Sequence, residues 1–314
     1  MGKIAFIFPG QGSQQPGMGK LMAEAYASAA DVFARADEVL GLPLSRLCFE
    51  GPAEELTLTV NTQPALLAVS VACHRVLEEA GLKPDFVAGH SLGEYSALVA
   101  ARALSLEDAV RTVRNRGRYM QEAVEVGVGA MAAILGAPRD VVEEACREVC
   151  RDHPDWVCSP ANFNSPQQIV IAGHAEAVQR AAERLRERGA RRVVMLSVSA
   201  PFHCALMKPA EERLADDLRR LPLRDLQIPL VTNVDAEIIT SGERARDALI
   251  RQVSRPVRWE DSIRRLVAEG VTTFVEVGPG RVLTGLVKNI DRTVETLSVE
   301  DPASLRETLA RLGQ

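Results

Sequence analysis

Residues 86–101 constrain the fold more than any other part of the chain. They begin with a short apolar run, pass through Gly89-His-Ser-Leu-Gly93, and continue as an apolar stretch of helical character. A G-x-S-x-G turn between a strand and a helix pushes the serine hydroxyl out at the carboxyl end of a sheet, with glycines where a Cβ would collide. The pattern predicts an α/β fold with Ser91 as an exposed nucleophile.

The helix expected after this turn would assist chemistry at Ser91. Its first N–H groups have no partner within the helix, and together with the helix dipole they favour negative charge at the turn. An attacking alkoxide or a tetrahedral oxyanion would develop such charge. Because glycine and serine are common, a chance match stays the alternative until other residues support the motif.

The composition excludes several classes of protein. A chain of 314 residues with 46% hydrophobic residues can bury a large core. Its 37 basic and 42 acidic residues give a net charge of -5, without the basic runs that bind nucleic acid. The apolar start reads as a first strand rather than a signal peptide, and no apolar run reaches membrane length. We expect a soluble, cytoplasmic protein that binds neither nucleic acid nor membranes.

Four residues lie close enough in sequence to suggest a zinc site: Cys146, Cys150, His153 and Cys158. They contain no C-x-x-C pair, and the first two cysteines fit the buried face of an expected helix. Six cysteines in a chain of this length do not form a disulfide scaffold either. We expect no metal site and no cofactor.

The chain has a central segment whose pattern differs from its flanks. Residues 127–198 show the order β-α-β-β-α-β, which is the split βαβ motif of ferredoxin-like domains. The strands are expected at 130–135, 156–161, 168–172 and 191–197, and the helices at 140–149 and 174–188. The turn-rich segment Asn162-Phe-Asn-Ser-Pro166 is expected to connect the two middle strands.

On both sides of this segment, strands alternate with helices, which implies a mainly parallel sheet with helices on both faces. Strands are expected at 3–8, 86–88, 227–232 and 272–277, with an edge strand at 294–299. Helices are expected at 31–40, 63–80, 105–124, 205–221, 245–254, 259–269 and 282–290. We therefore predict a large α/β-hydrolase-like domain, residues 1–126 and 199–314, with a small ferredoxin-like domain, residues 127–198, inserted in it.

Residues 9–19, rich in glycine and glutamine, follow the first expected strand, at the edge of the sheet where open α/β folds bind ligands. The segment lacks the third glycine of a dinucleotide fingerprint and the Gly-Lys-Ser/Thr of a phosphate loop. A loop that supplies backbone N–H donors is the better functional interpretation, and a plain surface loop is the alternative.

A serine hydroxyl needs a base to become a good nucleophile, and histidine is the usual one. His203 is the best candidate, because it lies on a loop where the chain returns to the large domain. A loop histidine with a structural hydrogen bond is the alternative. The other histidines lie in an expected helix, in the small domain, or beside the serine in a turn that points adjacent side chains apart: His74, His153, His174 and His90. No aspartate is an obvious third member, so a backbone carbonyl could orient His203.

Seven motifs carry a resemblance to a known family. In chain order they are Phe8-Pro-Gly-Gln-Gly-Ser13, Gly89-His-Ser-Leu-Gly-Glu94, Arg114-Asn-Arg-Gly117 with Met120-Gln-Glu-Ala123, Asn162-Phe-Asn-Ser-Pro166, Pro201-Phe-His-Cys204, Pro256-Val-Arg-Trp259 and Glu276-Val-Gly-Pro-Gly280. Together they resemble malonyl-CoA:acyl carrier protein transacylase of bacterial fatty acid synthesis. The resemblance covers essentially the whole chain, and seven spaced motifs are far more specific than any one alone.

The resemblance implies a ping-pong acyl transfer. Ser91 would be acylated by malonyl-CoA, and His203 would act as base and then as acid while the acyl group moves to the phosphopantetheine thiol of acyl carrier protein. In this family the histidine is oriented by a backbone carbonyl, at the position of Gln252. Backbone N–H groups of Leu92 and Gln11 would hold the oxyanion.

The resemblance also assigns substrate-binding residues. Arg116 would bind the malonyl carboxylate, since a planar guanidinium can pair with it bidentately. Acetyl-CoA would forgo that charge-assisted bond, which contributes about 1.5 to 3 kcal/mol. Phe202 matches an aromatic residue of malonyl-selective relatives that would crowd a methylmalonyl branch, but some bacterial relatives have a small residue there, so the pocket width stays open. Asn162, His90 and Gln252 complete the set.

Other functions stay open at this stage. A serine thioesterase or acyl hydrolase would use the same Ser91 and His203 with water as acceptor, and a catalytically silent module could simply dock acyl carrier protein. Arg116 and the small domain favour transfer. The acceptor pathway could be fatty acid synthesis, or polyketide synthesis with a trans-acting acyltransferase. We expect a monomer.

Overall fold

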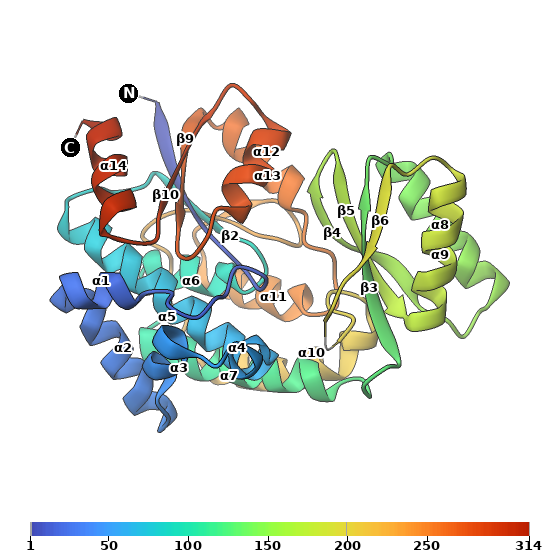
Figure 1. Cartoon of the computed structure of the whole chain (residues 1–314), viewed down its shortest axis with the longest axis horizontal. Helices are drawn as coiled ribbons and strands as arrows, with labels where there is room; N and C mark the ends of the chain where they lie inside the picture. The colour runs from blue at the N-terminus through green and yellow to red at the C-terminus, as the bar shows by residue number, and fades with distance from the viewer. Residues whose placement is uncertain (1, 199, 314) are drawn as a thin grey trace.

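The computed structural model describes residues 2–198 and 200–313, which build two sheets with helices packed around them (Figure 1). The larger sheet has six strands in the order β10-β9-β1-β2-β7-β8. All neighbours pair in parallel except β7 and β8, which are antiparallel. The strands are β1 (Lys3–Phe8), β2 (Phe86–Gly89), β7 (Leu230–Val231), β8 (Ile238–Ile239), β9 (Val271–Val277) and β10 (Glu295–Val299). The predicted α/β class with a mainly parallel sheet is confirmed.

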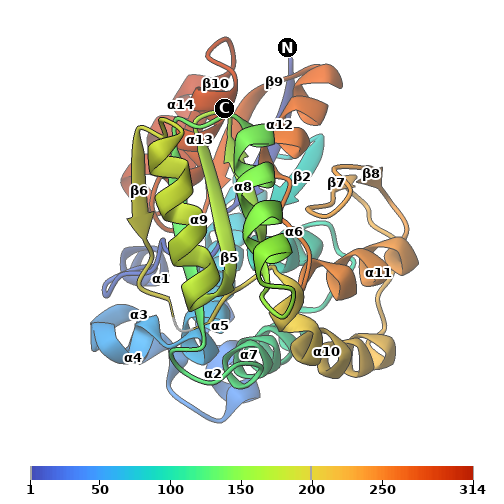
Figure 2. The ribbon, with the colours of Figure 1, turned by 90° about the vertical axis from the view of Figure 1, so that its right-hand side faces the viewer.

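The smaller sheet has four antiparallel strands in the order β4-β5-β3-β6. Its two helices cover the face that points away from the larger sheet (Figures 1 and 2). In chain order the elements are β3 (Gly129–Leu135), α8 (Arg139–Asp152), β4 (Cys158–Ser165), β5 (Gln168–His174), α9 (Ala175–Glu187) and β6 (Arg192–Met195). This is the predicted β-α-β-β-α-β order. The domain boundaries, 127 and 198, stay a prediction.

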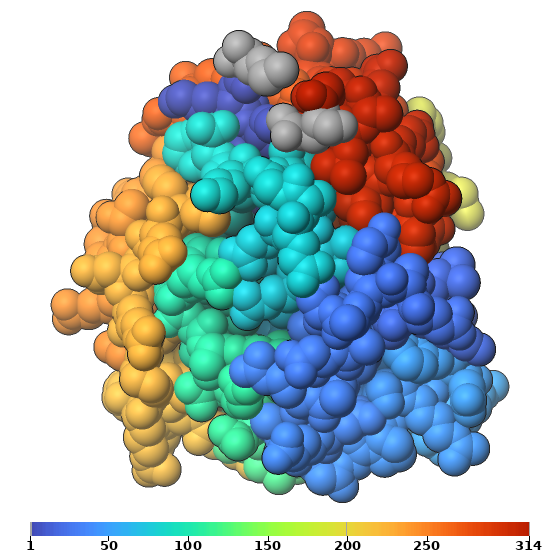
Figure 3. All heavy atoms as spheres, turned by 90° about the vertical axis from the view of Figure 1, so that its left-hand side faces the viewer, coloured from blue at the N-terminus to red at the C-terminus, as the bar shows by residue number. Residues whose placement is uncertain are grey.

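Helices cover both faces of the larger sheet. They are α1 (Lys20–Ala25), α2 (Ala27–Leu40), α3 (Leu44–Glu50), α4 (Ala53–Thr57), α5 (Thr59–Glu79), α6 (Gly93–Ala100), α7 (Leu106–Glu122), α10 (Lys208–Arg220), α11 (Gly242–Gln252), α12 (Trp259–Ala268), α13 (Val282–Ile290) and α14 (Pro302–Leu312). The central α5 is buried on almost every side and packs against α2 and α7. On the face in Figure 3, the N-terminal helices, in blue, meet α14, in red. None of the helices in the described ranges is long and apolar enough to cross a bilayer.

Several predicted elements differ from the structure in their extent. The strand expected at 227–232 is only Leu230–Val231, because the N–H of Gln227 instead bonds to the Ala101 carbonyl, 2.9 Å away. The segment 205–207 is a 3₁₀ turn, and α10 starts at Lys208 with a proline in its first turn. Five further elements, α1, α3, α4, α14 and β8, were not predicted. These elements are short, or lie in segments whose apolar spacing was not recognised as periodic.

Residues 162–165 were predicted as a turn and are instead the end of β4. Their backbone has partners on both sides, since β5 pairs along one edge and Val257 joins the other. The N–H of Phe163 donates to the Val257 carbonyl, and the N–H of Val257 donates to the Ala161 carbonyl, both at 2.9 Å. The chain after α11 therefore links the two sheets by backbone hydrogen bonds. This pairing accounts for the Pro256-Val-Arg-Trp259 motif.

Glu276, near the end of β9, is completely buried and fixes the start of α13. Its carboxylate accepts hydrogen bonds from the N–H groups of Leu283, at 3.0 Å, and Thr284, at 2.7 Å. Those N–H groups have no partner within the helix. Between β9 and α13 the chain turns at Gly278, whose φ of 132° is unfavourable for other residues. The Glu276-Val-Gly-Pro-Gly280 motif thus positions α13, which contributes to the cavity described below.

We predict that Glu276→Ala lowers the free energy of unfolding by about 1–3 kcal/mol, because two buried donors lose their acceptor. Glu276→Gln keeps one acceptor oxygen and should lose less. Urea unfolding of each variant provides the measurement. The matched control is Glu295→Ala on the neighbouring strand, which removes only a partly exposed ion pair with Arg311 and should cost less than about 1 kcal/mol. Equal losses for Glu276→Ala and the control would contradict this account of α13.

Candidate active site

Ser91 occupies a sharp turn between β2 and α6, which we call the elbow, residues 89–93. Its φ of 52° lies in the left-handed region, which is unusual for a residue other than glycine. The flanking glycines allow very close packing. A Cβ on Gly89 would lie 1.9 Å from the Gly93 carbonyl carbon, and a Cβ on Gly93 would lie 2.0 Å from the Phe8 carbonyl oxygen. The elbow therefore needs glycine at both positions.

Asn233, which the sequence analysis did not single out, braces the elbow from the loop after β7. Its side chain is fully buried and bonds to the first and the middle residue of the turn. The Oδ1 atom accepts from the N–H of Ser91, and Nδ2 donates to the Gly89 carbonyl, each at 2.7 Å. A lone asparagine after a short strand gives little signal in sequence. Only its position at the carboxyl edge of the sheet could have indicated it.

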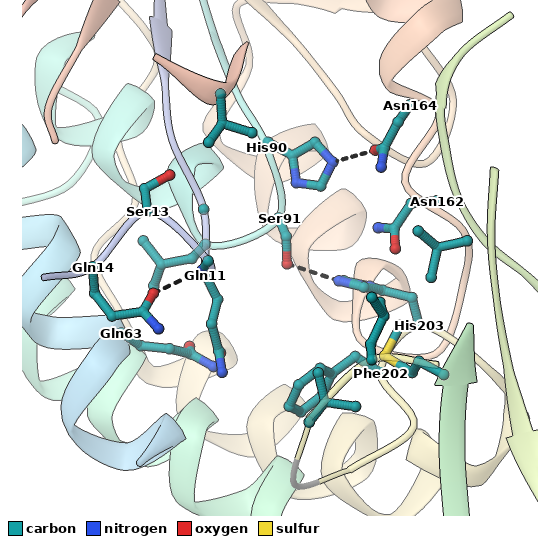
Figure 4. A pocket seen from close by; sticks show the side chains of 18 of the residues that line it. Gln11, Ser13, Gln14, Gln63, His90, Ser91, Asn162, Asn164, Phe202 and His203 are labelled. Atoms are coloured by element: carbon teal, nitrogen blue, oxygen red, sulfur yellow. Dashed lines mark hydrogen bonds between the residues drawn. The ribbon is translucent and has the colours of Figure 1, made fainter. Parts of the chain in front are cut away.

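His203 lies beside the serine, as the sequence analysis predicted. Its Nε2 is 2.7 Å from Ser91 Oγ, and its Nδ1 is 2.8 Å from the backbone carbonyl of Gln252 (Figure 4). A carbonyl can only accept, so Nδ1 carries the proton and Nε2 can accept the serine proton. Burial, reinforced by the nearby Arg116 cation, lowers the pKa of His203 to about 3. The ring is therefore neutral at physiological pH.

Arg116 reaches the same point from α7. The side chain is 1% exposed, and its guanidinium donates to Ser91 Oγ at 3.1 Å. It also donates to two side-chain amides, those of Gln63 at 2.8 Å and Gln252 at 3.0 Å. Burial lowers the pKa of Arg116, yet a guanidinium remains protonated in proteins. A positive charge thus lies within hydrogen-bonding distance of the nucleophile.

A buried acid, Glu94, lies behind these groups. It belongs to the elbow motif, but the sequence analysis gave it no role. Its carboxylate accepts from Gln252 Nε2 at 2.8 Å and from the N–H of Asn233 at 3.1 Å. Burial raises the pKa of Glu94 to about 7. Gln252 Nε2 also donates to the Ser91 carbonyl at 3.0 Å. Glu94, Gln252 and Asn233 therefore form a hydrogen-bonded network that supports the elbow.

The smaller sheet contributes to the site through β4. His90 Nε2 lies 2.8 Å from Asn164 Oδ1, and its ring points away from the Ser91 hydroxyl (Figure 4). The His90 ring also lies 5.5 Å from the ring of Trp259. Burial lowers the pKa of His90. The elbow thus contacts the smaller sheet through the half-buried His90.

These groups surround one cavity of about 770 Å³ between the two sheets. Eight of the nine site residues named in the sequence analysis line it: Gln11, His90, Ser91, Leu92, Arg116, Asn162, Phe202 and His203. The ninth, Gln252, lies behind Arg116 and His203 and bonds to both. Apolar residues of α13 and of the chain after β6 complete the wall. The residues are brought together, while their roles stay predictions.

The suspected zinc cluster has a different arrangement. Cys146 and Cys158 are buried, with Sγ atoms 3.7 Å apart, and His153 stacks on Trp156 at 3.9 Å. Across residues 2–198 and 200–313, no three His, Cys, Asp or Glu side chains are grouped so that they could hold a metal ion.

The fold and site agree with comparisons to known proteins. Residues 5–307 match the model of the acyl transferase domain family, so the chain belongs to that family. Among curated relatives, malonyl CoA-acyl carrier protein transacylase of Bacillus subtilis (strain 168) is 51% identical over 314 residues, covering 100% of this chain and 98% of the relative. The enzyme of the same name from Escherichia coli (strain K12) is 49% identical over 310 residues, covering 98% and 99%. The resemblance predicted from the seven motifs is confirmed.

Solved structures show the same similarity. The malonyl CoA-acyl carrier protein transacylase of Coxiella burnetii superposes with a TM-score of 0.96 at 42% identity, covering 100% of this chain and 98% of that one. A malonyl-transacylase solved in complex with a type II PKS acyl-carrier protein has a TM-score of 0.95 at 48% identity, covering 98% and 99%.

We predict that His203 stays neutral well below the usual histidine range in a pH titration followed by NMR of labelled histidines. In Arg116→Gln, which removes the neighbouring cation but keeps a polar side chain, the pKa of His203 should rise toward 6.5. The unfolded chain binds a proton at this residue below about pH 6.5 and the folded chain does not. Stability should therefore fall as the pH drops from 6.5 toward 3. A His203 signal that titrates near 6.5 in the unmodified protein would contradict the site geometry.

Proposed function

We propose that this enzyme transfers a malonyl group from malonyl-CoA to the phosphopantetheine thiol of an acyl carrier protein, through a malonyl ester on Ser91. The observation that carries the proposal is a buried arginine cation, Arg116, 3.1 Å from the hydroxyl of a serine paired with His203. A cation beside the nucleophile suits an acyl group that ends in a carboxylate. The names of the curated relatives give the same donor and acceptor.

In the first half-reaction, Ser91 Oγ attacks the thioester carbonyl carbon while its proton passes to His203 Nε2. The N–H groups of Leu92 and Gln11 hold the resulting oxyanion. The C–S bond then breaks, and His203 returns the proton to the CoA sulfur. Malonyl-Ser91 and free CoA remain.

The second half-reaction runs the same steps in reverse with a new thiol. His203 takes the proton of the phosphopantetheine thiol, the sulfur attacks the ester carbonyl, and the C–O bond to Ser91 breaks as His203 returns the proton to Oγ. The carbonyl of Gln252 holds the ring in one tautomer throughout. Arg116 lowers the pKa of His203, so a malonyl carboxylate that offsets the arginine charge makes His203 a stronger base once substrate is bound.

The remaining assignments belong to this proposal. Phe202 and Asn162 line the cavity and shape the space around the acyl group, while His90 helps to fix the elbow. We also propose a monomer, since the groups assigned to the reaction require no second subunit. Location in the cytoplasm rests on the sequence alone. Whether the enzyme acts in fatty acid or in polyketide synthesis depends on which acyl carrier protein the cell provides.

We predict that the protein retains one equivalent of malonyl group after it is mixed with malonyl-CoA and denatured, as measured by intact mass. Ser91→Ala should retain none, because the acyl acceptor is missing. CoA release without carrier protein should stop near one equivalent. Continued rapid release would identify a hydrolase instead, and no label on the unmodified protein would leave only a docking module.

We predict that Arg116→Ala lowers malonyl transfer by about 10- to 100-fold, the equivalent of losing one charge-assisted bond. Acetyl transfer should be spared or improved, since an acetyl group makes no such bond. The two substrates are compared by kcat/KM on the same enzyme preparation. The control, Arg118→Ala, removes an exposed arginine two residues away on the same helix and should leave both activities unchanged. Equal losses for both acyl groups in Arg116→Ala would show a structural role.

A further inference from the structure

The Arg116 cation is held by neutral groups alone. In the described chain, the guanidinium donates hydrogen bonds to Gln63 Oε1, Gln252 Oε1 and Ser91 Oγ. Two of these are carboxamide oxygens and the third is a hydroxyl, so none carries a charge. A buried charge without a counter-ion is costly, and most buried arginines are paired with a carboxylate. Within the described residues, no carboxylate bonds to Arg116 directly, and Glu94 acts on its charge only from a distance.

The neighbouring contacts orient both amides with oxygen toward the arginine. Gln252 Nε2 faces acceptors, among them Glu94 Oε2 at 2.8 Å and the Ser91 carbonyl at 3.0 Å. Gln63 is 1% exposed, and its Nε2 is directed at the sulfur of Met120, 3.7 Å away. Sulfur is a weak acceptor, so Gln63 gains most of its hydrogen bonding from Arg116. Neither side chain could turn its nitrogen toward the guanidinium without placing donor against donor.

The nearest acid is separated from the arginine. Glu94 bonds to the nitrogen end of Gln252, whose oxygen end bonds to Arg116, so the amide lies between the two charges. Gln63 has no such acid behind it and lies across the pocket from His203 (Figure 4). It is therefore the position from which a carboxylate could reach Arg116 directly, at the 2.8 Å separation that the amide oxygen now occupies.

We propose that Gln63 is a specificity-determining residue, whose uncharged amide holds Arg116 in place while leaving its charge for the free carboxylate of the incoming acyl thioester. A glutamate of nearly the same shape would neutralise the arginine internally. The substrate carboxylate would then add a second negative charge to a site that is already balanced. This inference rests on the proposed malonyl transfer and adds a reason for its selectivity.

The test compares Gln63→Glu with the unmodified protein, using malonyl-CoA and acetyl-CoA as separate acyl donors and carrier protein as acceptor. We expect kcat/KM for malonyl transfer to fall by about tenfold or more, mostly through KM, because loss of one charge-assisted bond has that magnitude. Acetyl transfer should stay within about threefold. The melting temperature should be unchanged or higher, since the new carboxylate pairs with a buried cation.

Two control variants separate charge from shape. Gln63→Leu removes the amide without adding charge. Arg116 then loses its hydrogen bond to Gln63 but keeps its free charge, so malonyl transfer should fall less than in Gln63→Glu and the preference for malonyl over acetyl should persist. Gln227→Glu adds the same charge at an exposed position and should change neither activity. An unchanged ratio of malonyl to acetyl transfer in Gln63→Glu, whether both activities fall equally or neither falls, would overturn the inference.

Malonyl uptake by the unmodified protein separates a failure of the proposed function from a failure of the role of Gln63. If it takes up no malonyl group on Ser91, the proposed function itself fails. If it takes up one equivalent, and the ratio of malonyl to acetyl transfer in Gln63→Glu is the same as in the unmodified protein, the function stands and only the role of Gln63 is wrong.

Discussion

The close approach of β1, β2 and α6 at the elbow is the constraint on which the rest of the structure depends. The backbone packs so closely around Gly89 and Gly93 that neither position has room for a Cβ atom. Ser91, between them, is held in a left-handed conformation. A strained backbone persists only where its surroundings determine it fully. Here Asn233 bonds to Gly89 and to the Ser91 N–H, and Gln252 bonds to the Ser91 carbonyl.

Gln252 joins several parts of the site, because it bonds to other side chains there besides the Ser91 carbonyl. Its backbone carbonyl fixes the tautomer of His203, its side-chain oxygen holds Arg116, and its side-chain nitrogen reaches Glu94. His203 and Arg116 are therefore both positioned by the end of α11. A shift of that helix end would disturb both together.

The sequence predicted the class of fold. The G-x-S-x-G turn indicated Ser91, and the loop where the chain returns to the large domain indicated His203, whereas Arg116 came only from the family resemblance. Gln63 and Asn233 escaped notice. Each is a neutral polar residue in an ordinary helical or loop context, and its contacts join segments far apart in the chain. The end of β4 was misjudged for a similar reason. Asparagine and proline favour turns locally, but pairing with β5 and Val257 outweighs that preference.

The hydrogen bonds between β4 and Val257 have a consequence for engineering. Consider a chimera that takes its ferredoxin-like segment from another acyltransferase. The new segment would be joined to the large domain by two covalent chain connections and also by these backbone hydrogen bonds. A donor segment must keep the register that places Asn162 opposite Val257, or Asn162 and Asn164 would leave the cavity wall and His90 would lose its partner. Residues 256–259 should therefore travel with the graft, although they lie outside it in sequence.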